Sequence, residues 1–174
     1  TISLQIFVIY LGITVMCALS YVAVGLTAFD AIVHAFTTVS TGGFSNYDSS
    51  FGHFSGAVEY VAIIFMIMAA LPFVRYVQLV NGNSRAIISD TQIKTFLITT
   101  LLVATFVFFV LNNLFPGDWE SALRKSLFNI TSIISGTGYS SDNYMSWGGM
   151  LVSVIFFIGL IVGCAGSTLS LIHI

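Results

Sequence analysis

The sequence predicts an all-α integral membrane protein that is built from two tandem units. In each unit a membrane-spanning helix is followed by a half-helix with its loop, and then by a second spanning helix. Three observations predict this fold class. Of the 174 residues, 57% are hydrophobic and only 7% are charged, far from the values of soluble domains. Four apolar segments have the roughly 20 residues that a spanning helix needs, and two shorter apolar segments lie between them.

We expect the four spanning helices at residues 2–27, 57–80, 93–115 and 149–172. The half-helices, at residues 30–39 and 122–134, would cover only about 15 to 20 Å at 1.5 Å rise per residue. Lipid cannot satisfy the backbone groups at the end of a half-helix, so protein or a cavity must surround it. The chain is thus divided into a first unit, residues 1–80, a polar link, residues 81–92, and a second unit, residues 93–174.

Charge and cysteine content exclude other classes of protein. A net charge of −2 with five Lys and Arg residues gives no basis for nucleic-acid binding. Cys17 and Cys164 lie in apolar segments without a partner at disulfide or metal-ligand spacing, so we interpret them as packing residues. No nucleophile with a base is apparent, and we expect neither an enzyme nor a cofactor. The chain lacks an initiator Met and stops inside an apolar segment, which indicates a fragment.

The charges also predict an orientation in the membrane. Arg75, Arg85 and Lys94 lie around the polar link, so the positive-inside rule makes that link cytoplasmic and lets the half-helices enter from outside. Arg124 and Lys125 lie on the assigned outer side and argue against this orientation.

The loops after the two half-helices carry one pattern. Residues 38–45 read Thr-Val-Ser-Thr-Gly-Gly-Phe-Ser and residues 133–140 read Ile-Ile-Ser-Gly-Thr-Gly-Tyr-Ser, at a separation of 95 residues. A selectivity filter replaces the hydration shell of a cation with a ring of oxygens, and glycine permits the backbone conformation that this needs. The sequence therefore predicts a K⁺-channel-like ion pathway. Its filter residues would be Ser40, Thr41, Gly42, Gly43 and Phe44, together with Ser135, Gly136, Thr137, Gly138 and Tyr139.

Neighbouring residues are expected to support these loops. Each half-helix directs its partly negative C-terminal end toward the membrane centre, where a cation is favoured. His34 and Asn129 occupy matching places in the half-helices and are interpreted as supports behind the filters. Asp48 and Asp142, just beyond the two filters, would raise the cation concentration at the mouth of the ion pathway.

Three further expectations concern side chains near the loops and in the second span. We expect Phe44 and Tyr139 to pack outward and to brace the loops against the spans. We expect the long side chains of Glu59 and Arg75 to reach the membrane interface from opposite ends of the second span. His53 is expected to be solvated.

Taken together, these motifs resemble the TrkH, KtrB and HKT superfamily of potassium transporters, and its bacterial TrkH branch most closely. The matching residues are 34–45, 71–76, 126–129 with 135–139, and 163–168, so that the resemblance covers nearly the whole chain. The family has four such repeats around one pore, and the motif order here resembles the second and third. The resemblance implies that K⁺ is held by the backbone carbonyls of Thr41, Gly42, Gly136 and Thr137.

The resemblance also implies a gate and several partners. In the family, the run that matches Gly163, Cys164, Ala165, Gly166, Ser167 and Thr168 interrupts an inner helix and forms an intramembrane gating loop. A close-packed helix interface is the other interpretation of these small residues. The implied surroundings are the inner bacterial membrane, the first and fourth repeats, a second copy in a homodimer, and a TrkA-like cytoplasmic nucleotide-binding subunit. Residues 169–174 depart from the family pattern, because they lack its glycines and basic residues.

Three alternatives stay open at this stage. An aquaporin-like channel would carry Asn-Pro-Ala at the half-helix tips, and neither loop does. A structural membrane subunit would use the loops for packing alone. A Na⁺/K⁺ channel or symporter of the same superfamily is the third alternative, although the family associates serine at a filter glycine with Na⁺, so that Gly43 and Gly138 favour K⁺.

Overall fold

The structure is a computed structural model that describes residues 2–83, 85–114, 116–160, 164, 167 and 168. Within these ranges every regular element is a helix, which confirms the predicted all-α class. The elements are α1 (Ile2–Ala23), α2 (Ala28–Val39), η1 (Ser50–His53), α3 (Ala57–Ala70), α4 (Phe73–Val80), α5 (Arg85–Ile88), α6 (Thr91–Leu114), α7 (Trp119–Ile134), η2 (Tyr144–Trp147) and α8 (Gly149–Gly159).

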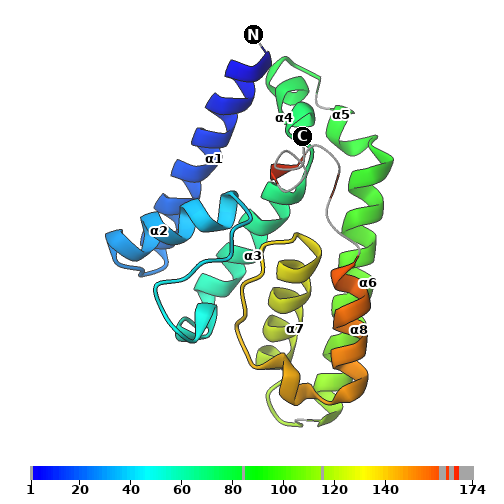
Figure 1. Ribbon diagram of the computed structural model, residues 1–174. Coiled ribbons are helices and arrows are strands. Elements are labelled where there is room, and N and C mark those ends of the chain that lie inside the picture. The colour runs from blue at the N-terminus through cyan, green and yellow to red at the C-terminus, as the bar shows by residue number, and fades with distance from the viewer. Residues whose placement is uncertain (1, 84, 115, 161–163, 165–166, 169–174) are drawn as a thin grey trace.

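The helices form two groups that meet along α3 and α7. In Figure 1, α1, α2 and α3 lie on one side of the molecule, while α6, α7 and α8 lie side by side on the other. The short helices α2 and α7 are the ones that lead into the two glycine-containing loops. The arrangement therefore brings two distant parts of the sequence to the middle of the fold.

Two of the expected spanning helices are present as single long apolar helices. Among the described residues, α1 with 22 residues and α6 with 24 residues are long and apolar enough to cross a membrane. The first span ends at Ala23 and not at residue 27, because the chain turns at Gly25, whose φ of 104° suits glycine. The fourth span is described only as α8, and the rest of its expected range includes residues outside the described part.

The expectation of a continuous helix over residues 57–80 was wrong. The chain forms two helices, α3 and α4, which meet at an angle of 90°. Pro72 has no backbone N–H to donate to the preceding turn, and Leu71 before it is extended, with φ −84° and ψ 153°. The proline therefore ends α3 and starts α4 in a new direction.

Both half-helices begin at a side-chain cap and carry an acidic residue in the first turn. Thr27 accepts a hydrogen bond from the backbone N–H of Asp30, and Asp118 accepts one from Ser121. These caps satisfy backbone donors that a helix start leaves unpaired. As a result α2 and α7 begin two and three residues earlier than the expected starts at 30 and 122.

An aromatic cluster around Phe51 fills the space between the two groups of helices. Phe51 in η1 is fully buried, and its ring lies 4.8 Å from that of Tyr139 and 4.9 Å from that of Phe128 in α7. Its other ring neighbours are Tyr21 in α1, His34 in α2 and Phe54. A residue of the link between α2 and α3 thus lies at the centre of the core beside the second loop.

Replacing Phe51 with Ala is expected to destabilise the protein by about 3–5 kcal/mol, because the aromatic cluster cannot close over the cavity. Phe29→Ala is the matched control, since Phe29 in α2 is 68% exposed. Thermal unfolding in detergent micelles measures both. Equal melting temperatures for the two variants would contradict the central role of Phe51.

Candidate functional site

The turns that follow α2 and α7 share three backbone hydrogen bonds. In the first loop, the backbone N–H groups of Ser40, Thr41 and Gly43 donate to the carbonyl oxygens of Phe36, Thr38 and Thr37, respectively. The residues 95 positions later make the same three bonds, Ser135 to Thr131, Gly136 to Ile133, and Gly138 to Ser132. The alignment that the sequence suggested therefore corresponds to a matched local conformation.

Positive φ angles occur at the same places in both loops. Gly43 has a φ of 64° and its counterpart Gly138 has 86°. Two residues earlier, Gly136 has a φ of 74°, whereas the first loop places Thr41 there with a φ of 53°. A threonine in this region is strained, because its branched side chain crowds the backbone. The first loop therefore holds a conformation that its own sequence does not favour.

The two loops contact each other through the backbone. A Cβ atom built on Gly43 would lie 2.1 Å from the carbonyl oxygen of Thr137 and 3.1 Å from the carbonyl carbon of Gly138. No side chain fits at Gly43 unless the second loop moves. Gly138 has open space around its corresponding position, so only its φ calls for glycine.

His34 and Asn129 connect each half-helix to the segment that leaves its loop. His34 Nε2 lies 3.0 Å from Ser45 Oγ, and its Nδ1 donates to the carbonyl oxygen of Asp30. Asn129 Nδ2 donates to Ser141 Oγ at 3.0 Å, while Asn129 Oδ1 accepts from the backbone N–H of Ser141. Both side chains are fully buried. They hold the returning chain against its helix.

A second connection lies one turn earlier on each half-helix. Asp30 accepts hydrogen bonds from Tyr47 Oη and Asn46 Nδ2, and Lys125 donates to Asp142 at 2.8 Å. The residue pairs 30 with 47 and 125 with 142 are also related by 95 positions.

The pKa of Asp142 reflects its ion pair with Lys125. Partial burial opposes the charge of Asp142, but the ammonium group of Lys125 and two N–H donors outweigh it and lower the pKa of the carboxyl group. Asp142 is therefore ionised at neutral pH and pairs with Lys125.

Tyr139 and Phe44 occupy matched positions but have different surroundings. Tyr139 is 2% exposed, and its hydroxyl contacts Thr37 Oγ1 and Thr38 Oγ1 and donates to the carbonyl oxygen of His34. Phe44 is 75% exposed. The expectation that each would brace its loop against the spans was wrong: Tyr139 packs onto the other half-helix, and the Phe44 side chain is mostly exposed.

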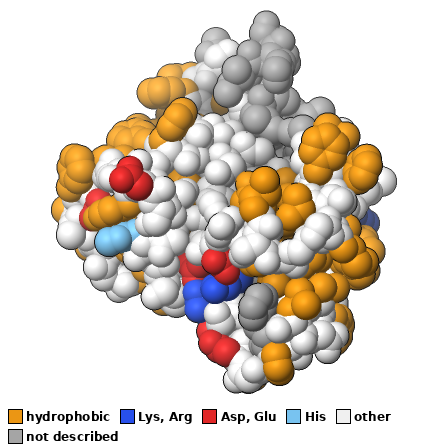
Figure 2. Space-filling view, turned by 60° about the horizontal axis from the view of Figure 1, so that its bottom comes forward, with side chains coloured by type: hydrophobic (Ala, Val, Ile, Leu, Met, Phe, Trp, Pro, Cys, Tyr) orange, Lys and Arg blue, Asp and Glu red, His pale blue; other side chains and the backbone are white. Residues whose placement is uncertain are grey.

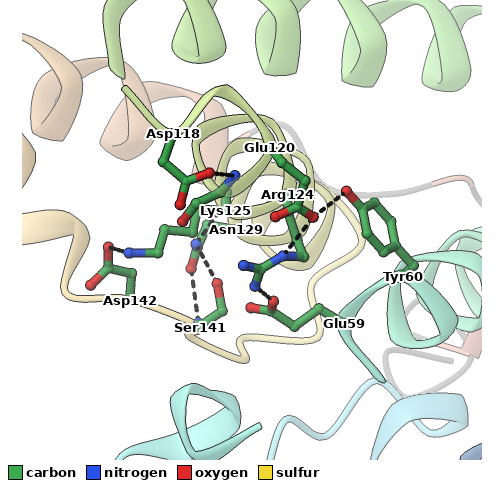
Figure 3. Close-up of polar contacts among 10 residues, drawn as sticks. Glu59, Tyr60, Asp118, Glu120, Arg124, Lys125, Asn129, Ser141 and Asp142 are labelled. Atoms are coloured by element: carbon green, nitrogen blue, oxygen red, sulfur yellow. Dashed lines mark hydrogen bonds and ion pairs between the residues drawn. The ribbon is translucent and has the colours of Figure 1, made fainter. Parts of the chain in front are cut away.

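The basic residues that argued against the orientation are paired with acids. Arg124 contacts Glu59 of α3 and Glu120 of its own helix, and Glu120 accepts from Tyr60 Oη at 3.0 Å. Figure 3 shows Arg124 and Lys125 leaving α7 on different sides. On the face brought forward in Figure 2, Lys and Arg side chains lie directly beside Asp and Glu side chains. Local pairing thus compensates both basic charges.

Glu59 and Arg75 behave differently from each other. Glu59 is 1% exposed, so the expectation that it reaches the interface was wrong. Arg75 is half exposed and pairs with Asp90 at 2.6 Å near the polar link. His53 is exposed, as expected, and stacks on Tyr47 at 3.7 Å between ring centroids.

The predicted gate run is described only in part. Gly163, Ala165 and Gly166 lie outside the described residues. Cys164, Ser167 and Thr168 are buried, and Thr168 Oγ1 donates to the carbonyl oxygen of Ala69 at 3.1 Å, one turn before the bend at Pro72. Thr168 also lines a cavity of about 360 Å³ together with Ser40 of the first loop, Phe73 and residues of α1. Cys17 is buried as well, as expected for a packing residue.

Sequence reasoning missed the contacts between the two halves of the fold. The backbone N–H of Gly52 in η1 donates to the carbonyl oxygen of Ser140, and Ser50 Oγ accepts from the backbone N–H of Ser140. The repeat separation of 95 residues could have identified the pair of Lys125 with Asp142 from its counterpart. No sequence signal pointed to Phe51 or to the pair of Glu59 with Arg124.

The two long apolar helices and the bent pair α3 and α4 indicate an integral membrane protein. It is 35% identical to the Trk system potassium uptake protein TrkI of Halomonas elongata, over 92% of this chain and 33% of the relative. It is 30% identical to TrkH of Escherichia coli K12, over 94% of this chain and 34% of the relative. The crystal structure of the potassium transporter TrkH from Vibrio parahaemolyticus matches with a TM-score of 0.88 and 29% identity, over 94% of this chain and 36% of that one.

The chain is therefore a homologue of the Trk system potassium uptake proteins, and the resemblance inferred from its motifs is confirmed. It spans about a third of the length of these curated relatives. Their names describe potassium uptake and not an enzymatic reaction. No protein-family model matches the chain.

Replacing Tyr139 with Phe is expected to destabilise the protein by about 1–2 kcal/mol, because buried hydroxyls of α2 lose a partner. Tyr10→Phe is the control, since the Tyr10 hydroxyl makes no hydrogen bond to the described part of the chain. Melting temperatures in detergent compare the two variants. If the Tyr139→Phe protein has the melting temperature of the wild type, the hydroxyl does not stabilise the contact between the two halves of the fold.

Proposed function

We propose that this chain forms two of the pore-loop units of a potassium-uptake protein and conducts K⁺ along an axis beside both loops. The observation that carries the proposal is the backbone contact of Gly43 with Thr137, made by two loops of matched conformation. Carbonyl oxygens of Thr41, Gly42, Gly136 and Thr137 would hold the ion.

The chemistry of the loops supports a cation rather than another solute. A K⁺ ion that leaves water needs replacement oxygens, and backbone carbonyls supply them without placing a fixed charge in the membrane. Residues Val39 and Ile134 end the two half-helices directly before the loops, so the partly negative helix ends point toward the proposed site.

A complete pore requires more chain than is present here. We propose that residues 1–80 and 93–174 act as two pore-loop repeats, joined by a cytoplasmic link at 81–92. The first and fourth repeats, a second copy in a homodimer and a TrkA-like nucleotide-binding subunit would complete the assembly in the bacterial inner membrane. These proposals rest on the similarity to proteins of about three times this length.

The residues around Thr168 are proposed to gate the pathway. Ser40 of the first loop and Thr168 line one cavity, and Thr168 is bonded to α3 beside the bend at Pro72. A movement of this run would change the access to the first loop from the cytoplasmic side.

The proposal is tested by Rb⁺ uptake into liposomes that hold the full-length protein, with its regulatory subunit supplied. Excess K⁺ should block uptake and excess Na⁺ should not. Equal block by both ions would favour the Na⁺/K⁺ alternative. Uptake no greater than in empty liposomes, with folding verified, would favour a structural subunit.

Gly43→Ala is expected to lower Rb⁺ uptake at least about 10-fold more than Gly138→Ala does, which corresponds to about 1.4 kcal/mol. Both variants carry the strain of a positive φ, but only the Gly43 side chain meets backbone of the other loop. Gly82→Ala, with a φ of 91° and open space, controls for strain outside the loops. Equal loss at Gly43 and Gly138 would contradict a filter assembled by contact of the two loops.

A further inference from the structure

We propose that the ion pair of Glu59 with Arg124 positions the second loop against the first and thereby sets the discrimination between K⁺ and Na⁺. This inference rests on the proposed function, since it concerns the geometry of the same two loops. In the described part of the chain, the polar contacts of both side chains lie on α3 and α7, so both would act as positioning residues.

Both side chains of the ion pair are largely buried. The Glu59 side chain is 2% exposed and that of Arg124 is 12% exposed. A carboxylate buried among apolar helices is strongly disfavoured unless a cation and further hydrogen bonds compensate it. The guanidinium group contacts Glu59 through one terminal nitrogen and Glu120 through Nε at 3.1 Å, so its planar fork spans both acids.

The pair connects elements that belong to different loops. Glu59 lies in the first turn of α3, shortly after the first loop and its outer link, and Arg124 lies in α7, which leads into the second loop. Tyr60 adds a hydrogen bond between the same two helices through Glu120. A shift of α7 along α3 would break both contacts.

The neighbouring residue, Lys125, fixes a different side of α7. Lys125 follows Arg124 and therefore projects about 100° around the helix, where it pairs with Asp142 beyond the second loop. Figure 3 shows the two basic side chains reaching acids on different sides of α7. Arg124 thus holds the helix to the first half of the fold, and Lys125 holds the loop to the helix.

The consequence for the loops follows from their contact. Gly43 and Thr137 meet with no room for a Cβ atom, so their relative position depends on where α7 lies. Binding geometries tolerate displacements of only about 0.5 Å before they lose specificity. Loss of the ion pair is therefore expected to change the ion selectivity of the pore more than it changes the amount of protein in the membrane.

The test is a double-mutant cycle on the full-length protein in liposomes, with Glu59→Gln, Arg124→Gln and both together. Rb⁺ uptake is measured against increasing K⁺ or Na⁺. The selectivity is the Na⁺ concentration that halves uptake divided by the K⁺ concentration that halves it. We expect each single variant to lower this ratio about 10-fold, because the loops shift by a fraction of an ångström. The double variant should lose no more than the worse single one, since both remove one interaction.

Glu120→Gln is the matched control. Glu120 is about half exposed, and glutamine keeps an acceptor for Tyr60 while it removes the charge that pairs within α7. Its selectivity should stay within about 2-fold of the wild type, as for an exposed i,i+4 pair. Arg124→Lys provides a milder variant, because an ammonium group keeps the charge opposite Glu59 but lacks the planar geometry of the guanidinium group, and a decrease of about 3-fold is expected.

The outcomes separate this inference from the proposed function. Wild-type protein without K⁺-selective Rb⁺ uptake would refute the proposed function itself. Selective wild-type uptake with an unchanged ratio in Glu59→Gln would overturn the inference alone, even if the variant melts earlier, because the pair would then be purely structural. If the Gln variants do not fold, an unchanged ratio in Arg124→Lys overturns the inference in the same way.

Discussion

The close approach of two backbones, at Gly43 and at the carbonyl group of Thr137, is the constraint on which the rest of the structure depends. A Cβ atom cannot be placed between them, and both chains must turn at residues with positive φ. The half-helices have to end at the same place from two directions, which requires matched hydrogen bonds at both ends. Much of the surrounding core, above all Phe51 and Tyr139, fills the space that this meeting creates.

Charges near the loops are few, and both basic residues of α7, Arg124 and Lys125, are paired with acids. Arg124 and Lys125 are neighbours on α7, and each has an acidic partner. In an apolar environment an unpaired charge would be costly, so pairing lets polar side chains fix helix positions without exposing charge to lipid. The one large apolar side chain left open at a loop, Phe44, marks a surface that the described residues do not cover.

The sequence predicted the elements better than their contacts. Apolar length located α1 and α6, and the repeated Gly-aromatic-Ser pattern located two loops with matched backbone turns. Pro72 alone could have predicted the bend, but the apolar length of residues 57–80 favoured one continuous helix. The partners of Glu59, Phe51 and Tyr139 were not predictable, because they come from packing between helices that are distant in the sequence.

The most direct test of the account is to locate the ion itself. Crystals of the full-length protein grown with Tl⁺ in place of K⁺ would give an anomalous signal at any site that replaces the hydration shell of the ion. The account predicts a peak beside the carbonyl groups of Thr41, Gly42, Gly136 and Thr137 that excess K⁺ removes and excess Na⁺ leaves in place. No peak at the loops, in crystals that bind Tl⁺ elsewhere, would contradict it.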